Sequence, residues 1–178
     1  MDDIADKLGC SKKTLYVFFE NRKDLVLKVI SNDMKKHELD INNVIAQRLH
    51  PIEEILSLNV IAINKLKTCH PSFQYDLKKY YPQSWNVFDK KNRQLTYEVS
   101  IQNLKKGIKK GCYRKEINPE IISKIFSEKI DVIFNSLAFE AINVSFSDVY
   151  KELINHHVLG IVNEEGRKYY LNFQKTTK

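Results

Sequence analysis

Basic and hydroxyl-bearing side chains gather near the start of the chain, where their types and spacing suit an anionic partner. From Ser11 to Lys23 four basic residues stand against one acidic residue, a local charge of +3. Such groups donate hydrogen bonds to phosphate oxygens and to acceptors on base edges. A pair such as Lys12 and Lys13 is more often a solvated helix face, so the surrounding elements must decide. The candidate contact residues are Ser11, Lys12, Lys13, Thr14, Tyr16 and Lys23.

Two short helices and a tight turn are predicted around these residues. Apolar residues repeat at helical spacing over residues 4–8, Gly9 breaks the pattern, and Ser11 can cap a second helix. Asn21 can cap a third helix, which places Lys23 in a first turn that favours anions. Helix, Gly-containing turn and helix form the geometry that reads double-stranded DNA in the major groove. The sequence therefore predicts a helix-turn-helix.

Motifs for catalysis and for metal binding do not occur. The chain has no Gly-rich phosphate loop, no GxSxG or HExxH sequence and no convincing pair of nucleophile and base. His156 and His157 are adjacent rather than four apart, and Cys69 with His70 has no third ligand in view. We expect no catalytic residues, no cofactor, no metal site and no enzyme activity.

Composition indicates a folded protein of ordinary globular character. The 178 residues are 43% hydrophobic and 29% charged, with a net charge of +7 that permits an acidic partner without requiring one. The longest apolar run, Leu15 to Phe19, is far too short to span a membrane, and the acidic start lacks the basic region of a signal peptide. We expect a cytoplasmic protein without a membrane partner.

The remainder of the chain repeats its apolar residues with the helical period, so the predicted fold class is all-α. One helix should run from Pro51 to about Lys67, and a long one should begin after Pro82 and end near Gly107 or Gly111. Pro119 should open the next helix. The last is predicted from an N-cap at Ser147 to the region of Gly160.

Two features of this helical part predict binding surfaces. The helices over residues 119–142 and 147–159 carry a wider apolar face than one subunit can cover, which favours a homodimer. Its expected interface residues are Ile125, Phe126, Ile133, Phe134, Leu137, Val149 and Leu153. Aromatic residues between positions 73 and 97 could line a pocket or could simply form core. The candidate effector-pocket residues are Phe73, Tyr81, Trp85, Phe88, Tyr97 and Ile101.

The first thirty residues resemble a known family. The segment DDIADKLGCSKKTLYVFFENRKDLVLKVI, Asp2 to Ile30, is similar to helices 2, 3 and the start of helix 4 of the TetR family of bacterial transcriptional regulators. The Ile-Ala, Gly, Ser-Lys, Thr-Leu-Tyr, Phe and Lys-Asp-Leu elements recur in register, and Cys10 replaces a small apolar residue. Later segments, HPSFQYDLKKYYPQSW, GIKKGCYRKEINPEI and HHVLGIVNEEGRKYY, resemble the ligand and dimerisation domain of a subset of that family.

The resemblance implies a DNA-binding head over residues 1–30 and an effector-binding, dimerising body over residues 31–178. It implies a repressor that a small-molecule effector releases from operator DNA. Family members begin with a further helix before the segment that starts here at Met1, so we expect an incomplete head, from a misassigned start codon or a truncated product. The alternative is a helical ligand-binding or interaction protein that does not bind DNA because its head is truncated.

Overall fold

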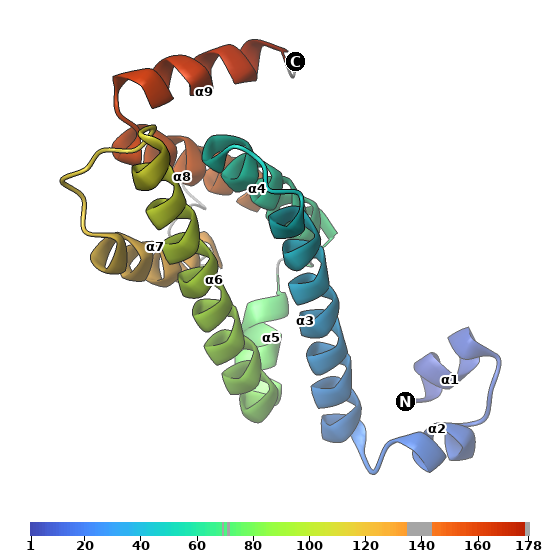
Figure 1. Cartoon of the computed structure of the whole chain (residues 1–178). Coiled ribbons are helices and arrows are strands. Elements are labelled where there is room, and N and C mark those ends of the chain that lie inside the picture. Colours follow the sequence, from blue (N-terminus) through green and yellow to red (C-terminus); the bar gives the residue numbers. More distant parts are fainter. Residues whose placement is uncertain (69, 71, 135–143, 177–178) are drawn as a thin grey trace.

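Helices make up the architecture throughout the described part of the chain. A computed structural model describes residues 1–68, 70, 72–134 and 144–176, and over these residues the chain forms nine helices and no strand (Figure 1). An isolated antiparallel bridge joins Tyr113 and Val162. The predicted all-α fold is confirmed. None of the helices in these ranges is both long enough and apolar enough to cross a membrane.

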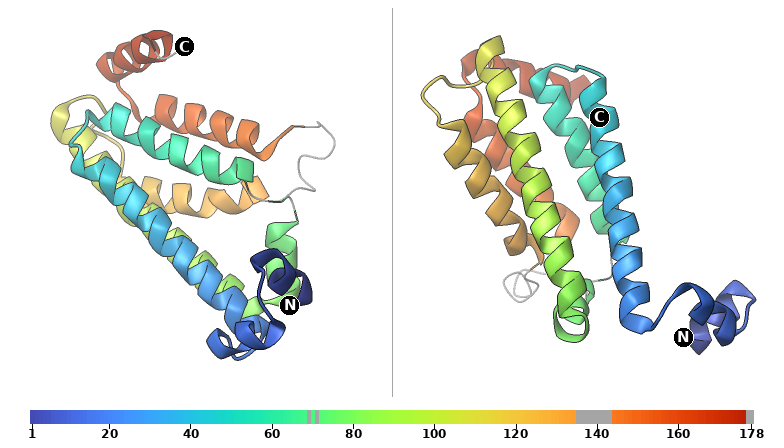
Figure 2. Two further views of the ribbon diagram at one scale, coloured as in Figure 1. Left: turned by 90° about the vertical axis from the view of Figure 1, so that its right-hand side faces the viewer. Right: turned by 60° about the horizontal axis from the view of Figure 1, so that its bottom comes forward.

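The head consists of two short helices, α1 (Asp2–Leu8) and α2 (Lys12–Phe18), which pack against each other. They lie beyond the N-terminal end of α3 (Arg22–Ala46), away from the remaining helices (Figure 1 and the right-hand view of Figure 2). Helix α3 therefore connects the head to the body. The expected boundary between them, at residue 30, lies within this one continuous helix.

The body is built from most of α3 and six further helices. These are α4 (Pro51–Thr68), α5 (Phe73–Tyr80), α6 (Pro82–Lys110), α7 (Pro119–Phe134), α8 (Phe146–Ile161) and α9 (Glu164–Thr176). The long helix α6 packs against α3, α4, α5 and α7, and α4 also packs against α3, α8 and α9. Figure 2 shows α9 at the end of the body opposite the head.

Local sequence signals explain where several helices begin and end. The predicted starts at Pro51 and Pro119 are confirmed, and the long helix begins at Pro82 itself rather than after it, because proline suits a first helical turn. Helix α6 ends at Gly111, whose φ of 78° is left-handed and whose amide donates to the carbonyls of Gly107 and Ile108. The prediction that Gly107 or Gly111 ends this helix therefore holds for the second of the two.

The predicted start of the last helix is wrong by two residues. Ser145, not Ser147, is the N-cap of α8, because the Ser145 hydroxyl accepts a hydrogen bond from the amide of Asp148. The helix runs one residue past Gly160, to Ile161, and α9 follows it. Neither α5, a helix of 8 residues between α4 and α6, nor α9 was predicted from the sequence.

Two apolar clusters hold the body together. The larger lies among α4, α6, α7, α8 and α9 and includes Ile52, Leu104 and Val158, which are at most 1% exposed. The smaller lies among α3, α5 and α6, around Ile30 and Met34. Burial of apolar side chains is the main favourable contribution to folding. The two clusters form a larger core remote from the head and a smaller core close to it.

Candidate functional site

The turn of the head holds its second helix through specific hydrogen bonds. Gly9 ends α1 in the left-handed conformation, with φ 63° and ψ 30°, which glycine adopts without a steric penalty. The Ser11 hydroxyl then accepts from the amide of Thr14 at 3.0 Å and contacts the Thr14 hydroxyl at 2.8 Å. Gly9 and Ser11 thereby perform the turn and cap roles that the sequence predicts.

The start of α2 presents its polar side chains to solvent. Ser11, Lys12, Lys13 and Thr14 are exposed, and Tyr16 is 44% exposed. The Lys12 ammonium donates to the Asp2 carboxylate at 2.9 Å, and this hydrogen bond raises the pKa of Lys12. Lys13 makes no ion pair with any described residue. The two lysines therefore differ in their availability to a partner, since Lys12 must first give up its contact with the Asp2 carboxylate.

The third predicted helix begins where its cap indicates. The Asn21 side-chain oxygen accepts from the amides of Lys23 at 2.9 Å and Asp24 at 3.0 Å, so Lys23 lies in the first turn of α3. The Asp24 carboxylate accepts from the amide of Glu20, one residue before the N-cap, and from Lys28. The cap is therefore confirmed. Asp24 binds the amide of Glu20, whereas the acidic residue of a capping box binds the amide of the N-cap residue itself.

The apolar residues of the head divide into covered and exposed groups. Ala5 on α1 and Leu15 on α2 are 3% and 5% exposed, and the two helices pack against each other. Leu8, Val17 and Phe18 are 65–75% exposed. Large apolar side chains at this exposure mark a surface that a further element or a partner can cover.

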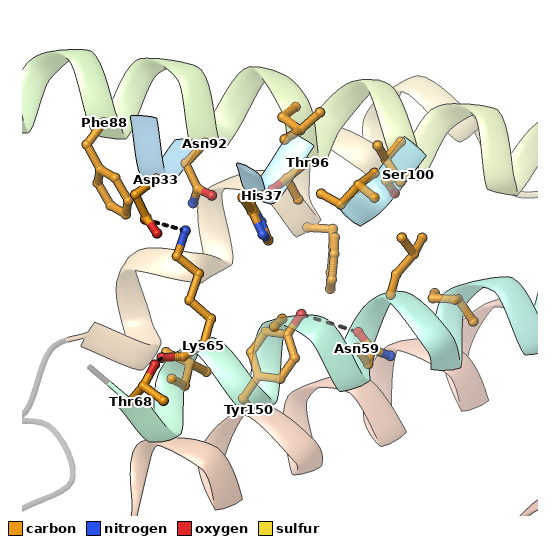
Figure 3. A pocket seen from close by; sticks show the side chains of 18 of the residues that line it. Asp33, His37, Asn59, Lys65, Thr68, Phe88, Asn92, Thr96, Ser100 and Tyr150 are labelled. Carbon is orange, nitrogen blue, oxygen red and sulfur yellow. Dashed lines mark hydrogen bonds and ion pairs between the residues drawn. The ribbon is translucent and has the colours of Figure 1, made fainter. Parts of the chain in front are cut away.

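The body contains a cavity of about 360 Å³ between the two apolar clusters. Figure 3 shows α3, α4 and α6 around it, and α5, α7 and α8 also contribute to its wall. Ile55 and Phe126 of the larger cluster and Phe88 of the smaller one line it, so it occupies the space between the two cores. Its volume falls within the range of about 300–1,000 Å³ typical of small-molecule sites.

One end of the cavity is polar and adjoins the outer surface. Asp33, His37, Lys65 and Thr68 line both the cavity and a hollow on the outside of α3 and α4. We call these four residues the mouth. The Lys65 ammonium forms an ion pair with the Asp33 carboxylate at 2.8 Å and thereby joins α4 to α3 across the mouth (Figure 3). Burial, reinforced by Lys65, lowers the pKa of His37 to about 4, so this imidazole is neutral at pH 7.

A second polar contact lies deeper in the wall. The Tyr150 hydroxyl on α8 donates to the side-chain oxygen of Asn59 on α4 at 3.2 Å (Figure 3). The Asn59 side-chain nitrogen is buried and has no hydrogen-bond partner among the described residues. Asn59 is 6% exposed, so a free amide donor lies at the wall of an apolar cavity.

The candidate pocket residues lie in different places. Phe73 and Phe88 line the cavity. Tyr81 and Trp85 pack against the smaller cluster, and Trp85 lies against Phe88 with ring centroids 5.6 Å apart. Tyr97 lines a separate hollow between α6 and α7, and Ile101 is half-buried outside the lining set.

The candidate dimer residues are also distributed. Ile125 is 45% exposed, whereas Phe126 is 9% exposed and stacks on His157 within its own chain, with centroids 4.3 Å apart. Val149 and Leu153 are half-buried against the larger cluster. Leu137 and the side chains of Ile133 and Phe134 lie outside the described residues.

Sequence reasoning missed the polar residues of the cavity. Asn59 and Tyr150 were not singled out, and neither were Asp33, His37 and Lys65. One signal was present at Asn59, which lies four residues after Ile55 on the predicted apolar face of the helix that begins at Pro51. A polar side chain at a core position is more informative than an exposed apolar one.

Comparisons with known proteins place this fold. No family model matches the chain. The chain is 26% identical over 160 residues to an uncharacterized HTH-type transcriptional regulator, YvaF of Bacillus subtilis, covering 77% of this chain and 84% of that protein.

Solved structures of similar shape include a TetR/AcrR family regulator of Thermobifida fusca, with a TM-score of 0.65 and 17% identity over 88% of this chain and 83% of that one. Another is FadR of Bacillus subtilis in complex with stearoyl-CoA, with a TM-score of 0.64 and 16% identity over 89% and 86% of the two chains. The chain therefore has the fold of the TetR family of transcriptional regulators.

Proposed function

We propose that the chain is a TetR-like transcriptional regulator that binds double-stranded operator DNA as a homodimer. It acts as a repressor, and a small-molecule effector in the body lowers its affinity for DNA. The observation that carries this proposal is that one helix joins the helix-turn-helix to the cavity of the body. Helix α3 begins directly after the helix-turn-helix and contributes Asp33, His37 and Ile41 to the cavity wall.

The DNA contacts are assigned to the exposed start of α2 and to the first turn of α3. Lys13 is the best candidate for a base edge, because it has no ion pair within the described residues, whereas Lys12 is bound to Asp2. Ser11, Thr14 and Tyr16 supply hydroxyl donors to phosphate oxygens. Lys23 supplies a cation in the first turn of α3, where the helix dipole also favours an anion.

The control step is a coupling of two equilibria. A ligand that prefers one position of α3 shifts the population toward that position, and it lowers DNA affinity by its difference in affinity for the two states. The relatives support this role in kind, since one is an HTH-type regulator and the FadR structure of this fold holds stearoyl-CoA.

The dimer is proposed to form through α7 and α8. A two-fold axis between these helices would position the two heads of the dimer to enter successive major grooves of the DNA. Ile121 and Ile125, which are 57% and 45% exposed on α7, support this choice. Light scattering at micromolar concentration should give twice 20.9 kDa, and a mass of one chain would contradict the dimer.

DNA binding is tested by fluorescence anisotropy on the DNA flanking the gene, at several salt concentrations. Lys23→Ala should weaken binding to all sequences alike and reduce the salt slope by about 0.9 for one lost phosphate contact. Lys13→Ala should lose roughly 1–3 kcal/mol of discrimination at one base position. Lys168→Ala on α9 removes an equal charge far from the head and serves as the control. Absence of specific binding by the wild type would favour a helical ligand-binding protein instead.

A further inference from the structure

We propose that the body cavity selects an uncharged, largely apolar molecule that carries one hydrogen-bond acceptor, such as a ketone or ester carbonyl, which the Asn59 amide binds. This inference rests on the proposed function only where it calls that molecule the effector. Ligand binding itself is independent of the head.

The wall sets the apolar character of the ligand. Its apolar side chains come from several helices around the cavity and make most of its surface, while Asn92, Thr96 and Ser100 add polar groups along the α6 side (Figure 3). The apolar residues are Ile41, Ile55, Leu58, Ala62, Leu66, Phe73, Phe88, Leu95, Val99 and Phe126. Removing apolar surface from water supplies most of the affinity in such a site.

Asn59 sets the requirement for an acceptor. Its side-chain oxygen is already engaged by the Tyr150 hydroxyl, so the amide group is oriented and its nitrogen is left to donate. Burial raises the pKa of Tyr150, which keeps that hydroxyl protonated and able to donate. A buried donor without a partner is unfavourable, and it gains most from a ligand oxygen placed against it.

The charges of the wall favour a neutral ligand over an anionic one. Among the described lining residues, Asp33 and Lys65 form an ion pair with each other, and His37 is uncharged at pH 7. His70, the other imidazole of the lining, lies two positions after the mouth residue Thr68 and accepts a hydrogen bond from the amide of Ser72. Both members of the ion pair belong to the mouth rather than to the surroundings of Asn59 (Figure 3). A carboxylate beside Asn59 would lose its hydration without gaining a cation, which disfavours the charged form.

Two probes of equal chain length test this choice. Binding of 2-nonanone and of nonanoate to the full chain at pH 8 is measured by titration calorimetry. We expect 2-nonanone to bind at least about tenfold more tightly, because nonanoate must bury its charge. Asn59→Leu should weaken the binding of 2-nonanone by about threefold to tenfold, which is the usual contribution of one neutral hydrogen bond. Asn42→Leu, at an exposed position on α3 outside the cavity lining, should leave binding unchanged.

An infrared measurement keeps the proposal testable if the Asn59 variant does not fold. The carbonyl stretch of bound, ¹³C-labelled 2-nonanone in the wild type should lie below its position in a hydrocarbon solvent, because the oxygen accepts a hydrogen bond. A band at the hydrocarbon position would contradict the role of Asn59.

The outcomes separate this inference from the proposed function. Tighter binding of nonanoate, or binding of neither probe, overturns the ligand class and leaves DNA binding by the head untouched. Tight binding of 2-nonanone by a protein that binds no DNA supports the ligand class and removes the effector role.

Discussion

Replacing Lys106 by methionine should destabilise the body, because the buried Glu54 carboxylate loses its cation. Glu54 on α4 is 1% exposed and accepts from the Lys106 ammonium at 2.8 Å and from the Asn103 amide at 3.0 Å, both on α6. The same Asn103 amide donates to the Pro51 carbonyl and its oxygen accepts from the Tyr113 hydroxyl. The network therefore joins the two helices next to the cavity.

The size of the effect follows from the exposure of each partner. Removing one member of a fully buried ion pair costs about 3–5 kcal/mol. The Lys106 side chain is 44% exposed, so water can hydrate the carboxylate after the substitution, and the Asn103 amide remains bound. We therefore expect a loss of about 1–3 kcal/mol in the free energy of unfolding.

Urea unfolding followed by circular dichroism measures this loss. Lys105→Met is the matched control, because Lys105 and Glu120 are 60% and 61% exposed at 3.6 Å, and its effect should stay within about 0.5 kcal/mol. Combining Lys106→Met with Glu54→Gln should reveal an interaction energy of roughly 1–2 kcal/mol. Equal effects of the two lysine substitutions, or strict additivity with Glu54→Gln, would refute the reasoning.

Three further predictions concern burial, close packing and the mouth. Burial lowers the pKa of His157 from 6.5 to about 4. Between these values the unfolded chain binds a proton at His157 and the folded chain does not, so the wild type is most stable above pH 6.5 and loses stability as the pH falls toward 4. As the pH falls through that range, the stability of His157→Phe relative to the wild type should therefore rise by about 1.4 kcal/mol per pH unit in urea unfolding. A difference in stability that does not change with pH would contradict this. Gly107→Ala places a Cβ against the buried Tyr113 ring, closer than van der Waals contact allows, and should cost about 1–3 kcal/mol in thermal unfolding, whereas Gly160→Ala, with open space around it, should not. Asp33→Asn breaks the ion pair of the mouth and should raise the association rate of 2-nonanone in stopped-flow measurements; an unchanged rate would exclude the mouth as the entry path.

The head was predictable because its signals are local. Gly9, Ser11 and Asn21 act through hydrogen bonds that span only a few residues, so their types and spacing determine the turn and both caps. The start of α8 was placed wrongly for a related reason. Ser145 and Ser147 are both good caps two residues apart, and the apolar period alone does not choose between them.

The cavity was not predictable because it depends on how helices cross. Aromatic residues from positions 73 to 97 are all apolar enough to line a pocket, yet Phe88 does and Trp85 does not, since they face different neighbours. The free donor of Asn59 arises only when Tyr150, which is 91 positions away, takes the amide oxygen. Such pairings are properties of tertiary packing and not of a sequence window.

The coupling of the cavity to the head is tested most directly by DNA affinity with and without bound ligand. Anisotropy titrations use the flanking DNA, a ligand already shown to bind the body, and two proteins, the wild type and Ala62→Phe, which fills part of the cavity. The ligand should lower the DNA affinity of the wild type by about 5-fold to 150-fold, the usual range of such couplings, and should leave the filled variant unchanged. Equal DNA affinity with and without ligand in the wild type would contradict a regulator controlled through this cavity.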